Sequence, residues 1–233
     1  MKKFIHKNDI GHFECPEIKI IDGKRFYVTP DGNAYPSITT ILSLQPKPGL
    51  DKWKKTVGEK KAKQISQESA RIGTIVHQLC EIYLNNIIVK LDAQEKIIRD
   101  TFNRLRFLLG NINNIVGNEI ALYSDLLRVA GTADCIAEYN GVPSVIDFKT
   151  SRKPKKEEWI DDYYMQTFAY KLMFEEMTGI EIKQVVILVA CIDQFEVQVF
   201  KKPAKDSDKY LTKLVNIMKA NPHITGAMHQ PTF

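Results

Sequence analysis

The residue pair Asn140-Gly141 constrains the fold of this chain more than any other short segment. It separates two runs rich in strand-forming residues, 128–139 and 142–149. A two-residue type I′ turn needs a positive φ at both of its positions, and Asn followed by Gly meets this need best. The sequence therefore predicts a tight hairpin with a fixed register between the two strands.

This register places two carboxylates opposite each other. Counting outward from Tyr139 opposite Val142 puts Asp134 opposite Asp147, as a non-hydrogen-bonded pair with Cα atoms about 4.5 Å apart. Lys149 follows Asp147 by two residues and shares its face. Carboxylates ~4 Å apart repel by roughly 4 kcal/mol at an effective dielectric of 20. A shared proton, the Lys149 cation or a divalent metal would offset this repulsion.

Three other interpretations of this segment stay open. One of the aspartates could lie in water at a frayed end of the sheet. Lys149 could form a plain salt bridge with one of the aspartates and have no catalytic role. A longer, bulged loop would shift the register and separate the two carboxylates.

Composition is that of an ordinary globular protein, with 233 residues, 44% hydrophobic and 26% charged. No run approaches the roughly 20 apolar residues of a membrane helix, and no apolar stretch follows the basic N-terminus, which argues against a secretory signal. We therefore expect a cytoplasmic protein without a membrane partner. The net charge of +5 fits a polyanionic partner, although a solvated lysine-rich surface explains it as well.

Hydrophobic periodicity predicts an α/β domain with a mixed sheet flanked by helices. We expect a hairpin over 18–28 around Asp22-Gly23, a turn at 31–33, and a helix over 38–44 capped by Ser37 or Thr39. A helical stretch with one or more interruptions is expected at 52–85, and further helices at 92–109 with Asp92 as cap, 161–177 and 205–220. Strands are expected at 118–124, 128–139, 142–149, 184–192 and 194–200. One domain would span 1–233, with an N-terminal hairpin and helical part (1–110) and a core (111–233).

Five motifs in order resemble those of RecB-type PD-(D/E)XK nucleases. They are Tyr35-Pro36-Ser37-Ile38-Thr39, Gly73-Thr74-x-x-His77, Gly131-x-x-Asp134, Val145-Ile146-Asp147-Phe148-Lys149-Thr150 and Gln166-x-x-x-Tyr170. The stretch from Asp134 to Lys155 is similar to the branch that contains mitochondrial genome maintenance exonucleases and related phage exonucleases, and so is Tyr35-Pro36-Ser37-Ile38-Thr39. The resemblance covers residues 35–200 and implies a restriction-endonuclease-like core with an N-terminal helical subdomain.

The resemblance also implies roles for single residues. Asp134, Asp147 and Lys149 would be catalytic, with Glu119 as a supporting acid. A Mg²⁺ or Mn²⁺ ion would be bound by His77, Asp134, Asp147 and the Phe148 carbonyl. Contacts with nucleic acid would come from Ser37, Thr39, Thr150, Ser151, Gln166 and Tyr170. Without the resemblance, His77 is better interpreted as a buried core histidine. Gln166 and Tyr170 are better interpreted as ordinary residues on a helix surface, and Glu119 could be a solvent-facing strand residue.

No iron–sulfur cluster is expected. Members of the superfamily that hold a cluster carry four cysteines flanking the nuclease core. Here Cys15, Cys80, Cys135 and Cys191 form no CxxC pair, and Cys80 and Cys135 fall within the core motifs.

The function implied is metal-dependent hydrolysis of DNA phosphodiester bonds from single-stranded ends. Lysine-rich stretches at 52–63 and 152–156 would follow the phosphates. The setting would be replication, recombination or repair in a bacterial or phage-infected cell, with other proteins of these processes as candidate partners. A structure-specific endonuclease or junction resolvase of the same fold is one alternative. A non-catalytic nucleic-acid-binding module is another, of a different class.

Overall fold

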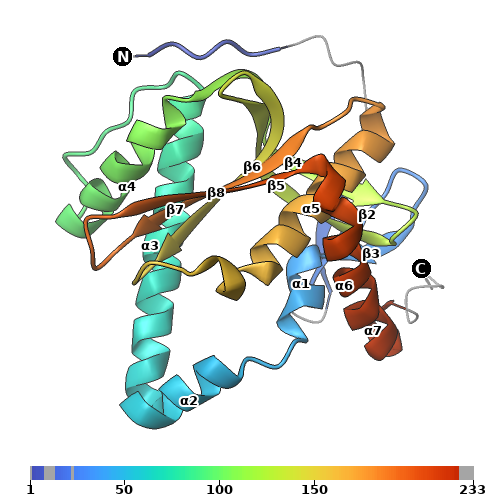
Figure 1. Ribbon diagram of the computed structural model, residues 1–233, viewed down its shortest axis with the longest axis horizontal. Helices are drawn as coiled ribbons and strands as arrows, with labels where there is room; N and C mark the ends of the chain where they lie inside the picture. Colours follow the sequence, from blue (N-terminus) through green and yellow to red (C-terminus); the bar gives the residue numbers. More distant parts are fainter. Residues whose placement is uncertain (1, 8–13, 22–23, 226–233) are drawn as a thin grey trace.

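Two β-sheets and the helices around them make up the computed structural model, which describes residues 2–7, 14–21 and 24–225 (Figure 1). The small sheet consists of β1 (Glu17–Ile21), β2 (Lys24–Val28) and β3 (Ala34–Pro36). The large sheet has the order β4 (Ile112–Ser124), β5 (Val129–Tyr139), β6 (Val142–Ser151), β7 (Gln184–Cys191) and β8 (Val197–Pro203). The helices are α1 (Ile38–Ser43), α2 (Pro48–Val57), α3 (Glu59–Leu84), α4 (Lys96–Leu109), α5 (Asp161–Thr178), α6 (Ser207–Ala220) and α7 (Pro222–Thr225), with 3₁₀ turns at Glu157–Trp159 and Ala204–Asp206.

The large sheet is mixed, as predicted. β4, β5 and β6 form an antiparallel meander, α5 connects β6 to the parallel strand β7, and β8 returns antiparallel to β7. Helices α3 and α4 cover one face through a core that includes Val76, Phe102 and Phe148. Helices α1, α5 and α6 cover the other through a core that includes Ile41 and Phe168 (Figure 1).

The Asn140-Gly141 hairpin is confirmed. Both residues have positive φ, +51° and +76°, and Tyr139 is paired with Val142. The pairing of β5 with β6 continues to Cys135 and Ile146 and stops there, although both strands continue. The two strands therefore separate at the next positions, which are those of Asp134 and Asp147.

The small sheet also follows the prediction, because Ile21 and Lys24 pair across a two-residue connection. The turn itself, Asp22-Gly23, lies outside the described residues. Ser37 is the N-cap of α1, where its hydroxyl accepts the Thr40 N–H at 3.1 Å.

Several predicted boundaries were wrong. The strand expected at 194–200 is β8 at Val197–Pro203, and the helical stretch expected at 52–85 consists of α2 and α3, with α2 starting at Pro48. Two further errors concern α4 and β4. Asp92 does not cap α4, which begins at Lys96, because residues 91–94 form a turn closed by a bond from the Gln94 N–H to the Leu91 carbonyl. β4 begins at Ile112, well before the predicted 118. The asparagine-rich segment hid this start, since Asn114 takes a left-handed φ of +47° within an irregularity that shifts the register between 113 and 117.

No helix within the described part of the chain has the length and apolar character needed to cross a membrane.

Candidate active site

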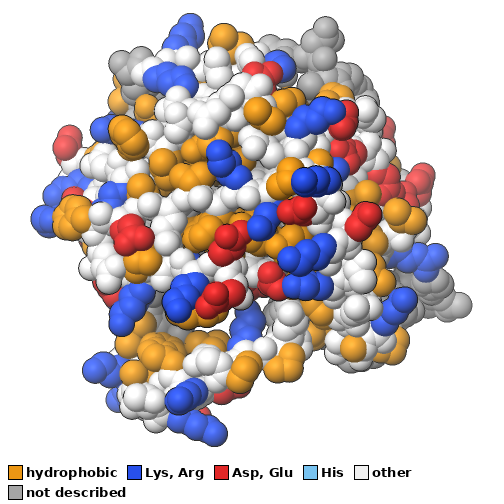
Figure 2. All heavy atoms as spheres, viewed as in Figure 1, with side chains coloured by type: hydrophobic (Ala, Val, Ile, Leu, Met, Phe, Trp, Pro, Cys, Tyr) orange, Lys and Arg blue, Asp and Glu red, His pale blue; other side chains and the backbone are white. Residues whose placement is uncertain are grey.

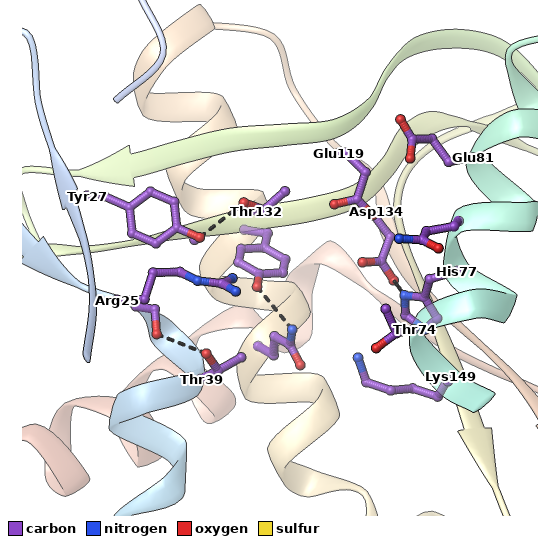
Figure 3. A pocket seen from close by; sticks show the side chains of 16 residues that line it. Arg25, Tyr27, Thr39, Thr74, His77, Glu81, Glu119, Thr132, Asp134 and Lys149 are labelled. Carbon is purple, nitrogen blue, oxygen red and sulfur yellow. Dashed lines mark hydrogen bonds and ion pairs between the residues drawn. The ribbon is translucent and has the colours of Figure 1, made fainter. Parts of the chain in front are cut away.

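A polar pocket of about 540 Å³ opens where β5 and β6 separate (Figure 3). Its walls come from the large sheet, from α3, from α1 and α5, and from strand β2 of the small sheet. The lining residues are Arg25, Tyr27, Ser37, Thr39, Gly73, Thr74, His77, Gln78, Glu81, Glu119, Gly131, Thr132, Asp134, Lys149, Gln166 and Tyr170. Segments far apart in sequence thus contribute to one concave, polar site.

Three side chains on one side of the pocket form a group that could hold a metal ion. His77, Glu119 and Asp134 each offer one ligand atom, and these three atoms all lie within 4.8 Å of one another. His77 projects from α3, and its Nδ1 lies 3.5 Å from an Asp134 carboxylate oxygen. One imidazole nitrogen and two carboxylates suit a divalent cation such as Mn²⁺ or Mg²⁺. The donors present therefore fit the metal that the sequence implied.

Glu119 has an unusual backbone conformation. It lies in β4 between Asn118 and Ile120, which pair with Cys135 and Ala133, so it is level with Asp134 on the neighbouring strand. Its φ is +50°, a left-handed value that non-glycine residues rarely adopt and that costs on the order of 1–3 kcal/mol. Such strain is typical of functional sites, where surrounding contacts fix an unfavourable conformation.

Asp147 and Lys149 form an ion pair at the base of the pocket. Lys149 Nζ lies 2.7 Å and 2.6 Å from the two carboxylate oxygens of Asp147, whose exposed fraction is 0%. The Asp134 carboxylate accepts the Phe148 N–H at 2.7 Å, which connects the two strands after their ladder ends. Asp147 therefore contacts lysine and is not part of the three-residue group, and its predicted role as a ligand, like that of the Phe148 carbonyl, stays a prediction.

Burial and the charges of neighbouring groups, both like and opposite, shift the pKa values in the site. Burial, and then the charge of Asp134, raises the pKa of Glu119 to about 7. Burial also raises the pKa of Asp147 to about 6, although Lys149 opposes this shift. For Asp134, burial is outweighed by His77 and Lys149, so its pKa is lowered. For His77, burial is outweighed chiefly by Asp134, so its pKa is raised. A divalent cation would relieve this repulsion among carboxylates.

The opposite wall carries hydroxyls and an amide. Ser37 and Thr39 share a hydrogen bond of 2.9 Å, and the Gln166 amide donates to the Tyr170 hydroxyl at 3.0 Å one helical turn away. All four were predicted to contact nucleic acid, and all four line the pocket. The other two, Thr150 and Ser151, do not line it. Thr150 packs beneath Gly73 of α3, and the Ser151 hydroxyl donates to the Lys153 carbonyl.

Sequence reasoning missed several lining residues. Glu81 had a local signal, since it follows His77 by four residues on a helix and so shares its face. Tyr163 does not line the pocket, but its ring centroid lies 5.4 Å from Lys149 Nζ. It had a similar signal, since it precedes Gln166 by three residues on α5. Arg25, Tyr27 and Thr132 meet in the pocket only because the small sheet docks against β5.

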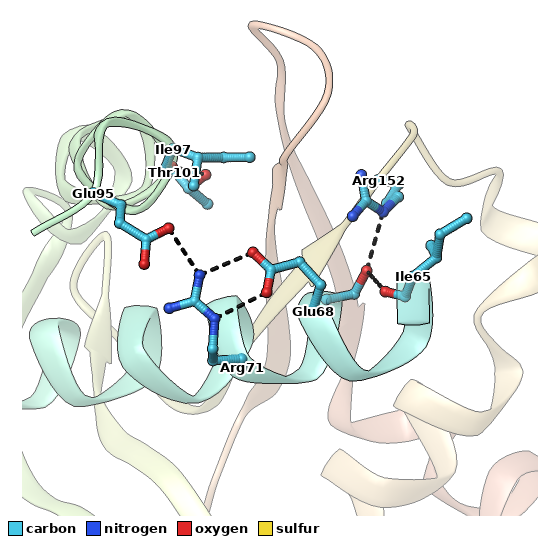
Figure 4. A network of polar contacts seen from close by, with 8 residues as sticks. Ile65, Glu68, Arg71, Glu95, Ile97, Thr101 and Arg152 are labelled. Atoms are coloured by element: carbon cyan, nitrogen blue, oxygen red, sulfur yellow. Dashed lines mark hydrogen bonds and ion pairs between the residues drawn. The ribbon is translucent and has the colours of Figure 1, made fainter. Parts of the chain in front are cut away.

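Polar contacts also join α3, which carries His77, to its neighbours (Figure 4). Arg71 bridges Glu68 of α3 and Glu95 at 2.9 Å and 2.8 Å, and Arg152, just after β6, donates to Ser69 at 3.1 Å. These groups are largely exposed, and each such pair contributes about 0–1 kcal/mol. The apolar core between α3 and the sheet therefore does most to place His77.

Gly131 is required by the approach of Tyr170. A Cβ at position 131 would lie 2.6 Å from the Tyr170 ring and 3.1 Å from its hydroxyl. We expect Gly131→Ala to displace Tyr170, break its bond with Gln166, and destabilise the protein by about 1–3 kcal/mol. Urea unfolding measures this loss of stability. Gly49→Ala is the matched control, because a Cβ there meets nothing within 4 Å and alanine favours the helix. Equal stability of the two variants would contradict the prediction.

The chain is similar in sequence to several known proteins. A sequence model described as the PD-(D/E)XK nuclease superfamily matches residues 89–221. Mitochondrial genome maintenance exonuclease 1 from Homo sapiens is 28% identical over 132 residues, which cover 53% of this chain and 38% of that protein. The Mus musculus protein is 29% identical over 131 residues, covering 53% and 39%. The chain thus matches well under half the length of these relatives.

Two solved structures are weakly similar. The crystal structure of SSO0001 has a TM-score of 0.42 at 18% identity, covering 84% of this chain and 78% of the other. A structure from Eubacterium rectale, of a protein proposed to be an exonuclease, has a TM-score of 0.44 at 13% identity, covering 70% and 69%.

Proposed function

Because the chain belongs to the PD-(D/E)XK nuclease superfamily, with its restriction-endonuclease-like α/β fold, we propose that it is a metal-dependent DNA exonuclease acting from single-stranded ends. One observation carries the proposal: a possible metal group of His77, Glu119 and Asp134 shares a pocket with Lys149. Superfamily membership supports a nuclease acting on DNA, and the single-strand preference is our inference from the surface around the site.

Each catalytic residue has a role that its position supports. His77, Glu119 and Asp134 would hold the metal, with Asp147 as a further predicted ligand. A divalent metal bound there would polarise a nonbridging phosphate oxygen and lower the pKa of a water molecule. The Lys149 ammonium, which lines the same pocket, would orient the attacking water and stabilise negative charge on the phosphate. Gln166 and Tyr170 would bind the strand from the opposite wall.

A lysine-rich surface toward the N-terminal end of α3, the helix that also carries His77, supports a single strand as substrate. Helices α2 and α3 meet at Gly58, and a second cavity between them is lined by Lys54, Lys60 and Lys63 among other residues. Figure 2 shows a hollow between α2 and the body of the molecule, with lysine and arginine side chains around it. A surface with lysines in these positions would follow the backbone of a single strand without reading its sequence.

Cleavage of end-labelled DNA tests the function directly. The substrates are linear single-stranded, linear double-stranded and circular single-stranded DNA, with Mg²⁺, Mn²⁺ or EDTA, for the wild type and Lys149→Ala. We expect metal-dependent degradation of linear single strands, with circles spared and the variant inactive. Cutting of circles would replace the exonuclease with the endonuclease alternative. Absence of cleavage with every metal would leave a non-catalytic DNA-binding module.

The cellular role follows from the proposed activity. An exonuclease specific for single strands would act in replication, recombination or repair, in the cytoplasm of a bacterial or phage-infected cell, beside other proteins that expose single-stranded ends. Co-purification of such proteins with the tagged chain, dependent on DNA, would support this setting.

A further inference from the structure

We propose that the β1–β2 hairpin is part of the substrate site, with Arg25 binding a phosphate group of the strand and Ile20 packing against the adjacent sugar or base. The inference rests on the proposed function, because it places substrate in the same pocket. The phosphate could be an internal phosphodiester or a terminal phosphate, which share the same chemistry.

Tyr27 fixes the orientation of Arg25. Alternate residues of a strand share a face, so Arg25 and Tyr27 project from the same side of β2. Tyr27 is buried against the large sheet, and its hydroxyl is 3.0 Å from that of Thr132 on β5. Because Tyr27 is held against β5, this side of the hairpin faces the pocket. Both residues line it, and Figure 3 shows Arg25 extending into the space beside the metal group.

The same side of the hairpin carries exposed apolar residues. Ile20 pairs with Arg25 and Ile18 pairs with Tyr27, and cross-strand partners share a face. Ile20 is 68% exposed and Ile18 is 49% exposed. A nucleic-acid strand alternates anionic phosphates with apolar sugars and bases. Exposed apolar side chains beside an arginine would match both parts of such a strand.

The charge of Arg25 is available for a ligand. Among the described residues, no carboxylate lies within 4.0 Å of its guanidinium. Glu119, one of the candidate metal ligands, lines the same pocket as Arg25. A guanidinium binds a phosphate through two parallel hydrogen bonds, and it would hold the nucleotide while the metal group and Lys149 act on the neighbouring bond.

Four variants test the inference: Arg25→Ala, Arg25→Lys, Ile20→Ser and the control Lys19→Ala. Lys19 pairs with Phe26 and lies on the opposite face of the same hairpin, so its replacement removes equal charge away from the pocket. We measure KM and kcat with Mn²⁺ on oligonucleotides with 5′-hydroxyl or 5′-phosphate ends. Separately, we measure binding in EDTA over a range of KCl concentrations.

We expect Arg25→Ala to raise KM roughly tenfold or more with a smaller change in kcat, as for loss of a hydrogen bond to a charged group. The slope of log K against log salt should fall by about 0.7, the value for one phosphate contact with a single strand. Arg25→Lys should keep the slope but recover only part of the affinity. Ile20→Ser should raise KM a few-fold without changing the slope.

If Arg25→Ala raises KM for oligonucleotides with either 5′ end, Arg25 binds an internal phosphodiester. If it raises KM only for oligonucleotides with a 5′-phosphate, Arg25 binds the terminal phosphate. Arg25→Ala behaving like Lys19→Ala in both assays would overturn the inference, even if the wild type is an active nuclease. Conversely, a changed salt slope in a protein that cleaves nothing would support the contact while the proposed activity fails.

Discussion

Replacement of Lys149 by methionine is expected to abolish cleavage and to destabilise the metal-free protein by about 3 kcal/mol. The Lys149 ammonium donates a hydrogen bond to Oδ1 of the fully buried Asp147 at 2.7 Å and lies 2.6 Å from its Oδ2. Methionine has a similar volume but no charge, so it leaves a buried carboxylate without a counter-ion. Urea unfolding in EDTA measures the stability, and end-labelled single-stranded DNA measures the activity.

The double variant Asp147→Asn/Lys149→Met separates the two effects. Replacing a buried ion pair by neutral groups of similar shape is often close to neutral for stability. We therefore expect the double variant to recover most of the lost stability while remaining inactive. If Lys149→Met alone is as stable as the wild type, the ion pair is not a structural element. If the double variant cleaves DNA, Lys149 has no catalytic role.

Asp134→Asn is expected to remove metal binding while leaving the metal-free fold almost unchanged. Asparagine keeps an oxygen that can accept the Phe148 N–H, and it removes the charge that raises the pKa of Glu119. For the wild type, Mn²⁺ at 100 times its Kd should stabilise the fold by about 2.7 kcal/mol. The variant should lose this stabilisation and at least roughly 100-fold of the activity. Thermal unfolding with and without Mn²⁺, beside cleavage rates, provides the measurement.

Glu81→Gln is the matched control for Asp134→Asn. Glu81 lines the same pocket and interacts with Glu119, but it is not part of the three-residue metal group. We expect this variant to keep the Mn²⁺-dependent stabilisation. If Mn²⁺ stabilises Asp134→Asn as much as it stabilises the wild type, the metal binds elsewhere.

Local chemistry made the central hairpin predictable from sequence. Asn140-Gly141 favours only a tight turn, and a tight turn fixes which residues of the two strands face each other. The ladder found between Tyr139–Val142 and Cys135–Ile146 has the predicted register. Helix α5 was predictable for a similar reason, since Gly179 ends it in a left-handed conformation.

The remaining boundaries depended on features with weaker local signals. Asp92 is a good capping residue by type, but a turn over the next residues delays α4 until Lys96. The start of β4 was obscured because asparagine tolerates the left-handed conformation that Asn114 adopts inside a strand. Both errors arose where a polar residue type fits more than one backbone conformation.

The sequence by itself determined which strands carry Asp134, Asp147 and Lys149, because turn geometry and strand alternation act over a few residues. Only the tertiary structure decided that His77 lies 3.5 Å from Asp134, that Glu119 adopts a left-handed conformation beside them, and that Arg25 enters the same pocket. These placements result from the packing of α3 and of the small sheet against the large sheet. Packing of this kind depends on burial summed over many distant side chains, which no local pattern encodes.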